Sequence, residues 1–162
     1  VAGVQTCALP IYVHVRAYAR DRTISAPTAA QRLSSLHQEG LLTKEWNHNY
    51  LCYTANRKSR LFVSLSQSYW LWKFGKVGLL DHIERHVITP RVVLFGSFAK
   101  GEVTGQSDID LALFTPSKNV GDLSVFERKL KRKLHVLLFS SEAAVKNKEL
   151  LRSVRNGYVL VE

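Results

Sequence analysis

Two carboxylates one residue apart are the side chains in this sequence best suited to chemistry. Asp108 and Asp110 flank Ile109, and an apolar run from Leu111 to Phe114 follows them. Side chains alternate along a strand, so an Asp-x-Asp pair there points both carboxylates to one face. Close carboxylates repel each other unless a cation lies between them. The spacing predicts that Asp108 and Asp110 bind a divalent metal, and Mg²⁺ suits such hard oxygen ligands.

A Gly-Ser pair upstream adds a second feature with a chemical use. Gly96 and Ser97 end the apolar run that begins at Val92, and ten residues separate Ser97 from Asp108. A corner after a strand offers free backbone N–H groups, which suit phosphate. Glycine lets the backbone approach phosphate closely, and Ser97 adds a hydroxyl. Lys100 is either a counter-charge for that phosphate or a solvated loop lysine.

The elements that must position these residues alternate between strand and helix. This order favours a small α/β sheet domain. The predicted elements are strands at 91–95, 108–114, 134–139 and 158–161, a helix at about 123–133, and a helix capped by Ser140 and running to about Arg155.

The run Leu94-Phe95-Gly96-Ser97, the gap and Ser107-Asp108-Ile109-Asp110-Leu111 resemble the DNA polymerase β-like nucleotidyltransferase superfamily, most closely its minimal members. The resemblance covers 79–162. It implies that Asp108 and Asp110 are catalytic and hold one or two Mg²⁺ ions on a nucleoside triphosphate. The reaction would move a nucleoside monophosphate to a protein or nucleic-acid hydroxyl. The resemblance also implies a possible small helical partner of toxin–antitoxin type.

The superfamily pattern includes a third carboxylate, which this sequence lacks at the expected place. The strand after the next helix, 134–139, contains no Asp or Glu, and His135 occupies the position. Neutral imidazole is a poorer Mg²⁺ ligand than a carboxylate. Two ions are therefore expected only if a third ligand exists, and Glu142 is the candidate substitute.

Residues 12–56 follow a different order: a short strand near Tyr12, two helices and a two-stranded hairpin. The second helix, about 26–38, has Ser25 as its predicted N-cap, Pro27 in its first turn and Gly40 as its C-cap. This segment resembles archaeal and bacterial winged helix-turn-helix regulators. Residues 3–11 resemble a translated sequencing adapter and are treated as an artefact. The winged helix is therefore expected to be truncated at its start.

The second of these helices matches a recognition helix that enters the major groove. Its candidate DNA contacts are Ser25, Gln31, Arg32 and Ser34. Residues 1–56 contain 5 Lys and Arg against 3 Asp and Glu, a weak electrostatic footprint for DNA. The alternative is that this domain serves only dimerisation or docking.

Residues 57–78 form a predicted connector, a helix interrupted by Gly75 and Gly78. Its apolar and aromatic stripe is either a base-stacking surface or part of the core or of an interface between domains or subunits. The stripe consists of Leu61, Leu65, Tyr69 and Trp72, with Phe62 and Trp70 beside it. His82 and His86, on the next helix, are a metal pair or exposed histidines. Five of the seven residues from Glu127 to Lys133 are basic. They favour either a polyanion-binding face, such as one for an RNA acceptor, or a solvated helix face.

Bulk composition sets the remaining limits. The net charge of +10 and pI of about 9.9 favour a polyanionic partner. No apolar run reaches membrane-spanning length. Cys7 and Cys52 show no CxxC spacing, so the sequence predicts neither a disulfide framework nor a zinc site. A reducing, cytoplasmic location is therefore expected.

The sequence thus predicts a mixed α/β (α+β) protein with a winged helix, connector helices and a nucleotidyltransferase domain. Two functions remain open. One is a Mg²⁺-dependent nucleotidyltransferase, supported by the intact Gly-Ser and Asp-x-Asp motifs. The other is a DNA-binding transcriptional regulator whose nucleotide-binding domain is weakly active or inactive, supported by the winged helix and the missing third carboxylate.

Overall fold

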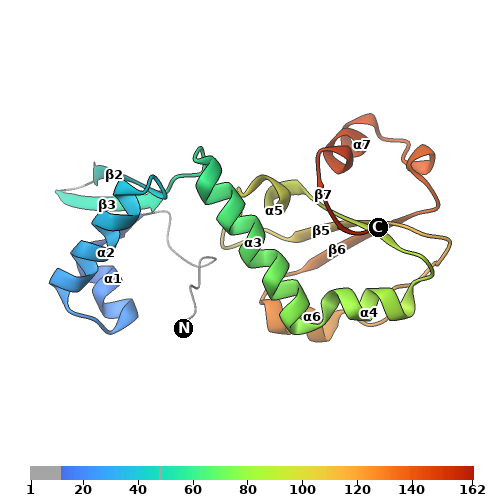
Figure 1. The fold of residues 1–162 in the computed structure, drawn as a ribbon, viewed down its shortest axis with the longest axis horizontal. Helices are drawn as coiled ribbons and strands as arrows, with labels where there is room; N and C mark the ends of the chain where they lie inside the picture. The colour runs from blue at the N-terminus through green and yellow to red at the C-terminus, as the bar shows by residue number, and fades with distance from the viewer. Residues whose placement is uncertain (1–11, 48) are drawn as a thin grey trace. The chain divides into compact units, whose positions relative to one another are not determined.

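The computed structural model describes residues 12–47 and 49–162 (Figure 1). The chain divides into two compact units, Val1–Leu65 and Ser66–Glu162. The adapter-like residues 3–11, with the truncation expected there, and the hairpin residue His48 lie outside the described part. The mixed α/β architecture is confirmed, with a separate sheet in each unit.

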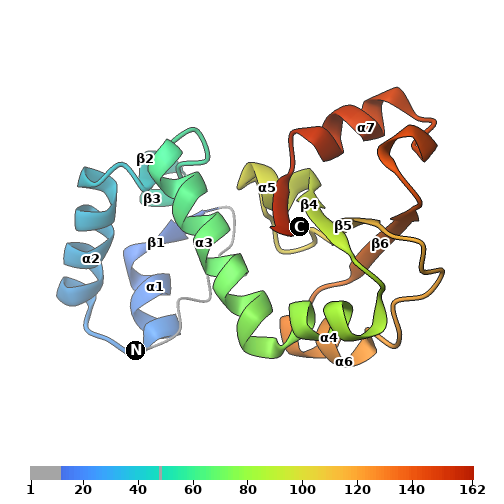
Figure 2. The same cartoon turned by 45° about the vertical axis from the view of Figure 1, so that its right-hand side comes forward.

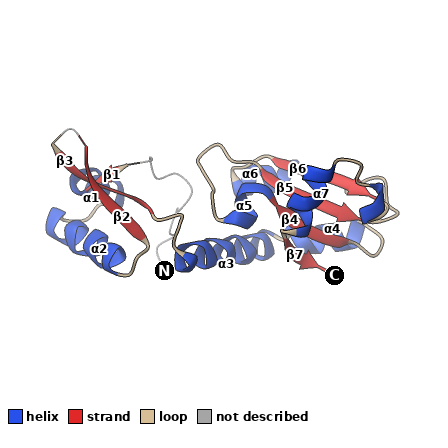
Figure 3. Cartoon of the chain, turned by 90° about the horizontal axis from the view of Figure 1, so that it is seen from above, coloured by secondary structure: helices blue, strands red, loops and turns tan. Residues whose placement is uncertain are grey.

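The N-terminal unit contains two helices and a three-stranded antiparallel sheet of order β1-β3-β2, which Figure 3 colours by element type. Its small core gathers Val13, Leu33 and Tyr53. The elements are β1 (Val13–His14), α1 (Val15–Arg22), α2 (Ala26–Gln38), β2 (Leu42–Asn47) and β3 (Tyr50–Ala55). This order agrees with the expected one, while its assignment as a winged helix stays a prediction.

Helix α2 begins as its sequence indicates. The Ser25 hydroxyl accepts a hydrogen bond from the Thr28 N–H, which satisfies one of the free donors of the first turn. Ala29 and Leu33 are buried on its inner face. The C-cap is Glu39, and the predicted cap Gly40 follows it with φ of +74°.

The predicted break at Gly75 is wrong. Helix α3 (Arg60–Val77) continues through Gly75, where an added Cβ would meet nothing within 4 Å. Gly78, with φ of +77°, separates α3 from α4 (Leu79–His86). In the part of α3 that belongs to the C-terminal unit, Trp70 and Phe74 are buried, whereas Trp72 is exposed, so the predicted stripe is core only in part.

The C-terminal unit is built on a four-stranded mixed sheet of order β6-β5-β4-β7 (Figure 2). Strand β4 is antiparallel to β5 and β7, whereas β5 and β6 are parallel and need the crossover that contains α6. The elements are β4 (Arg91–Phe95), α5 (Gly96–Lys100), β5 (Ile109–Phe114), α6 (Ser124–Leu130), β6 (Leu134–Phe139), η1 (Glu142–Ala144), α7 (Lys148–Arg155) and β7 (Tyr158–Val161).

Helix α7 covers one face of this sheet, and α4 and α6 lie on the other (Figures 1 and 2). Val93, Phe95, Ala112 and Phe114 pack on the α7 side together with Val154. Because side chains alternate, Asp110 on β5 shares the face of Ala112 and Phe114. The predicted cation ligand therefore faces the α7 side of the sheet.

Two predicted helices differ from the observed ones. The helix expected from Ser140 to Arg155 is wrong, because η1 ends at Ala144 and a separate helix starts at Lys148. The Asn147 side chain caps that second helix by accepting hydrogen bonds from the Glu149 and Leu150 N–H groups. Helix α6 stops at Leu130, short of the predicted Lys133, because Lys131 takes a left-handed φ of +53°.

Candidate functional site

The Gly-Ser corner and Asp110 lie against each other. Phe95, which ends β4, pairs with Asp110 on β5, and Gly96 follows it. A Cβ added to Gly96 would lie 2.3 Å from Asp110 Oδ2, and Gly96 has φ of +70°. Both the missing side chain and the left-handed backbone call for glycine here. The close approach places the start of α5 beside the Asp110 carboxylate.

Asp108 lies just before β5 and is exposed, while Ile109 between the two aspartates is fully buried. The Ile109 N–H donates to the Lys133 carbonyl at 2.9 Å, which ties this segment to the start of β6. The Ser107 hydroxyl accepts a hydrogen bond from the Thr104 N–H at 2.9 Å and stabilises the preceding turn. The two aspartates thus stand at the end of the sheet where the Gly-Ser corner lies.

Helix α5 is anchored from behind by an aromatic contact. Phe98 is fully buried, and its ring centroid lies 4.6 Å from that of Trp70 in an edge-on arrangement. Ser97 is half-buried and Lys100 is exposed. Gly96 and Lys100 line a cavity of about 450 Å³ whose other wall is α7.

His135 lies beside Asp110 on the neighbouring strand. The two residues are register partners, and His135 Nδ1 lies 3.2 Å from Asp110 Oδ1. The His135 side chain is 62% exposed and the Asp110 side chain 25%. The imidazole therefore contacts the carboxylate at the position where the superfamily pattern would place a third acid.

Comparison with protein families identifies the family of the domain that carries these residues. The family described as "Nucleotidyltransferase domain" matches residues 79–159, half of the 162 residues. The chain belongs to the nucleotidyltransferase domain family. No curated protein matches the chain. The match lies within the C-terminal unit and includes Gly96, Ser97, Asp108 and Asp110.

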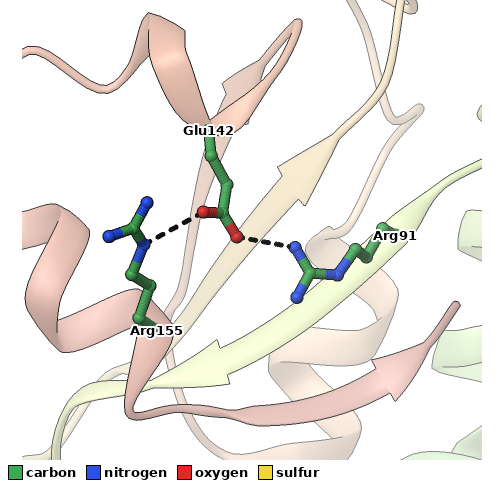
Figure 4. Close-up of polar contacts among 3 residues, drawn as sticks. All are labelled: Arg91, Glu142 and Arg155. Atoms are coloured by element: carbon green, nitrogen blue, oxygen red, sulfur yellow. Dashed lines mark hydrogen bonds and ion pairs between the residues drawn. The ribbon is translucent and has the colours of Figure 1, made fainter.

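The nucleotidyltransferase domain lacks an obvious third acid near Asp110. The prediction that Glu142 replaces the third carboxylate is wrong. Its side chain instead accepts hydrogen bonds from Arg91 Nη1 at 2.9 Å and from Arg155 Nε at 3.0 Å (Figure 4). Arg91 begins β4 and lies four residues before Phe95, the residue that pairs with Asp110. Four residues along a strand span about 13 Å, so Glu142 is held well away from Asp110. Hydrogen bonds from Arg91 and then Arg155 lower the pKa of Glu142.

The metal-ligand set is correspondingly small. Among the residues that the structure describes, no three His, Cys, Asp or Glu side chains are grouped closely enough to hold a metal ion. The carboxylates of Asp108 and Asp110 are of the hard oxygen type that Mg²⁺ takes as ligands, and a metal site at these two residues stays a prediction. A second ion finds no further carboxylate beside them in this part of the chain.

The predicted pair His82 and His86 is structural. His82 Nε2 lies 3.1 Å from the Val120 carbonyl, and His86 Nδ1 lies 2.8 Å from the His82 carbonyl. Their rings stack with centroids 4.0 Å apart. The His82 contact ties the loop before α6 to α4, while the His86 contact lies within α4. Because a carbonyl oxygen only accepts, the ring nitrogen that faces each carbonyl serves as a donor.

The basic residues between 127 and 133 differ in what they contact. Arg132 donates to the Thr104 and Gly105 carbonyls, which fixes the turn before Asp108. Arg128, Lys129, Lys131 and Lys133 are exposed. A polyanion-binding role for these four residues stays a prediction.

The predicted DNA contacts all lie on or before α2. Gln31 and Arg32 are exposed, and Ser34 is half-buried. Ser25 uses its hydroxyl to cap the helix. Within the described residues, no helix has both the length and the apolar character needed to cross a membrane.

Sequence reasoning missed the α7 wall of the cavity. Its lining residues are Glu149, Arg152, Ser153 and Asn156. The signal was present as polar residues at helical spacing opposite the apolar Leu150, Leu151 and Val154. What the sequence did not show is that this polar face turns toward Gly96.

Proposed function

We propose that the C-terminal unit transfers a nucleoside monophosphate from a nucleoside triphosphate to a hydroxyl of a protein or nucleic acid. The supporting observation is the close approach of Gly96 to the Asp110 carboxylate. It puts a predicted phosphate-binding corner next to a predicted metal ligand. Membership of the nucleotidyltransferase domain family supports nucleotidyl transfer in general.

In this proposal the residues of the chain bind and orient the reactants. The amides at the start of α5, the Ser97 hydroxyl and Lys100 bind phosphate oxygens. The acceptor oxygen attacks the α-phosphorus, the bond to pyrophosphate breaks, and the acceptor proton leaves to water. A Mg²⁺ ion bound by Asp108 and Asp110 would supply stabilisation of the charge that develops on the phosphate oxygens.

The test is transfer of label from α-labelled nucleoside triphosphates to protein and RNA acceptors with Mg²⁺. Asp108→Ala and Asp110→Ala should abolish transfer. Asp81→Ala is the matched control, because Asp81 is exposed on α4 and outside the site. Absence of transfer by the unaltered protein to every acceptor, despite Mg²⁺-dependent nucleotide binding, would refute the proposal.

A second candidate function is a DNA-binding regulator with a weakly active or inactive transferase domain. The observation that favours it is His135 against Asp110, where the superfamily pattern has a carboxylate. The exposed Gln31 and Arg32 on α2 would then contact DNA. Anisotropy of labelled duplex DNA should show salt-dependent binding that Arg32→Ala weakens and Arg60→Ala, an exposed arginine at the start of α3, does not. Absence of any such binding would rule this function out.

A further inference from the structure

The cavity between α5 and α7 offers a second set of groups beside the proposed reaction centre. It measures about 450 Å³. Gly96 and Lys100 line it from α5, and Glu149, Arg152, Ser153 and Asn156 line it from α7 and its C-terminus. Because Gly96 also touches Asp110, the cavity opens next to the metal-ligand edge of the sheet.

The α7 residues reach the cavity because of their spacing. Positions 149, 152, 153 and 156 share one face of a helix. The opposite face packs Leu150, Leu151 and Val154 against the sheet core. The orientation of the polar face is therefore set by apolar packing, and Arg152 is held at the cavity by the fold.

The lining fits phosphate better than a nucleobase. Lys100 and Arg152 give two positive charges against the one carboxylate of Glu149, and Ser153 and Asn156 add polar groups. No aromatic side chain lines it among the described residues. Base sites rely on aromatic or apolar surfaces, whereas phosphate sites rely on guanidinium, ammonium and amide donors.

Arg152 differs from its helix neighbour in what it contacts. Arg155 bonds to Glu142 at 3.0 Å. Arg152 is exposed and forms no ion pair with any residue in the described part of the chain. Its guanidinium is thus available for a phosphate without first breaking an ion pair.

We propose that this cavity binds the β- and γ-phosphates of the nucleoside triphosphate, with Arg152 as a binding residue that acts together with Lys100. The inference rests on the proposed function and adds α7 to the site. The α-phosphate then lies toward Gly96 and Asp110, where transfer would occur. Pyrophosphate, the product, leaves from the cavity between α5 and α7.

The test is calorimetric titration of the full chain with ATP, AMP and inorganic tripolyphosphate at physiological ionic strength. Arg152→Gln should weaken binding of ATP and tripolyphosphate about tenfold, the loss of one charge-assisted contact, and leave AMP binding unchanged. Arg152→Lys should retain part of the affinity. Arg85→Gln is the matched control, since Arg85 is exposed on α4 and its guanidinium donates to the Asp81 carbonyl of its own helix.

Circular dichroism and the thermal midpoint show whether Arg152→Gln folds, and Lys100→Gln tests the opposite wall if it does not. The inference is overturned if the unaltered protein binds neither ATP nor tripolyphosphate. It is also overturned if Arg152→Gln leaves their binding unchanged or weakens AMP equally.

The label-transfer assay separates the two proposals. Transfer with no effect of Arg152→Gln on binding would refute only the role of the cavity. Tripolyphosphate binding that depends on Arg152, without transfer to any acceptor, would support the cavity and refute the transferase.

Discussion

Replacing Gly96 with alanine should destabilise the protein through two separable effects. The first is conformational, because Gly96 has φ of +70°. The second is steric, because the new Cβ would lie 2.3 Å from Asp110 Oδ2 and 3.3 Å from its Cγ. Asp110 must move, and its contact with His135 at 3.2 Å would change with it.

The two effects have different sizes. A left-handed backbone costs a residue with a Cβ about 1–2 kcal/mol. Forcing extra volume into a packed place typically costs about 1–3 kcal/mol, and the half-buried Asp110 side chain has room to yield, which favours the lower part of that range. The free energy of unfolding should therefore fall by about 2–4 kcal/mol, a large part of the roughly 5–15 kcal/mol of an ordinary domain.

Urea unfolding of the full chain, followed by tryptophan fluorescence and circular dichroism, measures this loss. In an Asp110→Ala background the steric part disappears, and Gly96→Ala should cost only about 1–2 kcal/mol. Gly75→Ala is the matched control. Gly75 is helical with open space at its Cβ, so alanine should stabilise α3 by about 0.5–1 kcal/mol.

Two results would refute this reasoning. One is an unfolding midpoint for Gly96→Ala equal to that of the unaltered protein. The other is the same cost with and without the Asp110 carboxylate, which would show that the two groups do not meet. Loss of stability in Gly75→Ala would contradict the prediction that alanine fits the open space at position 75 and stabilises α3.

Three further predictions concern the same unit. His135→Asp should raise Mg²⁺ affinity and, under the proposed function, nucleotidyl transfer, because it puts a carboxylate opposite Asp110; unchanged Mg²⁺ affinity by calorimetry would contradict this. Hydrogen bonds from arginine lower the pKa of Glu142 below its ordinary 4.5. The stabilisation is therefore complete above that value and is lost as pH falls through the lowered pKa, so Glu142→Gln should remove this part of the acid dependence of the thermal midpoint. Trp70→Ala should cost about 3–5 kcal/mol in urea unfolding because the side chain is buried 4.6 Å from Phe98, and a cost equal to that of the milder Trp70→Phe would argue against this contact.

Much of the strand structure could be predicted because it depends on local patterns. The predicted bounds of β4, β6 and β7 agree with the structure, since each is an apolar or β-branched run ended by a turn residue or a charge. The N-cap at Ser25 was also predictable, because a hydroxyl before Pro27 has few other uses.

The errors arise where tertiary contacts override a local pattern. Ser140 and the residues after it have helical spacing, yet Glu142 accepts a hydrogen bond from Arg91, which is distant in sequence. Asn147 then caps the start of a separate helix, α7. The residue type at Gly75 predicts a break, but one exposed glycine costs a long helix only about 1 kcal/mol. Such costs are too small to end a helix that buries Trp70 and Phe74.

The candidate site divides in the same way. The residue types at positions 96, 97, 108 and 110 are readable as a motif, because their spacing is short and lies between strands. The α7 side of the cavity could not be predicted from the sequence, because it depends on how Leu150, Leu151 and Val154 pack against the sheet. Arg152 and Arg155 look equivalent in the sequence, and only packing separates the first, at the cavity, from the second, bound to Glu142.

The bridge from Glu142 to Arg91 and Arg155 joins the beginning of β4 to the end of α7 (Figure 4). Since α7 also carries Arg152, an occupant of the cavity and the protonation of Glu142 become thermodynamically coupled, and coupling of this kind is reciprocal. Acid that protonates Glu142 should loosen α7 and weaken the ligand, and the ligand should in turn delay acid unfolding. The rise that tripolyphosphate causes in the thermal midpoint should then shrink in the unaltered protein as pH falls through the lowered pKa of Glu142, and should approach the rise seen in Glu142→Gln, so a contact far from Asp110 would set the acid limit of binding.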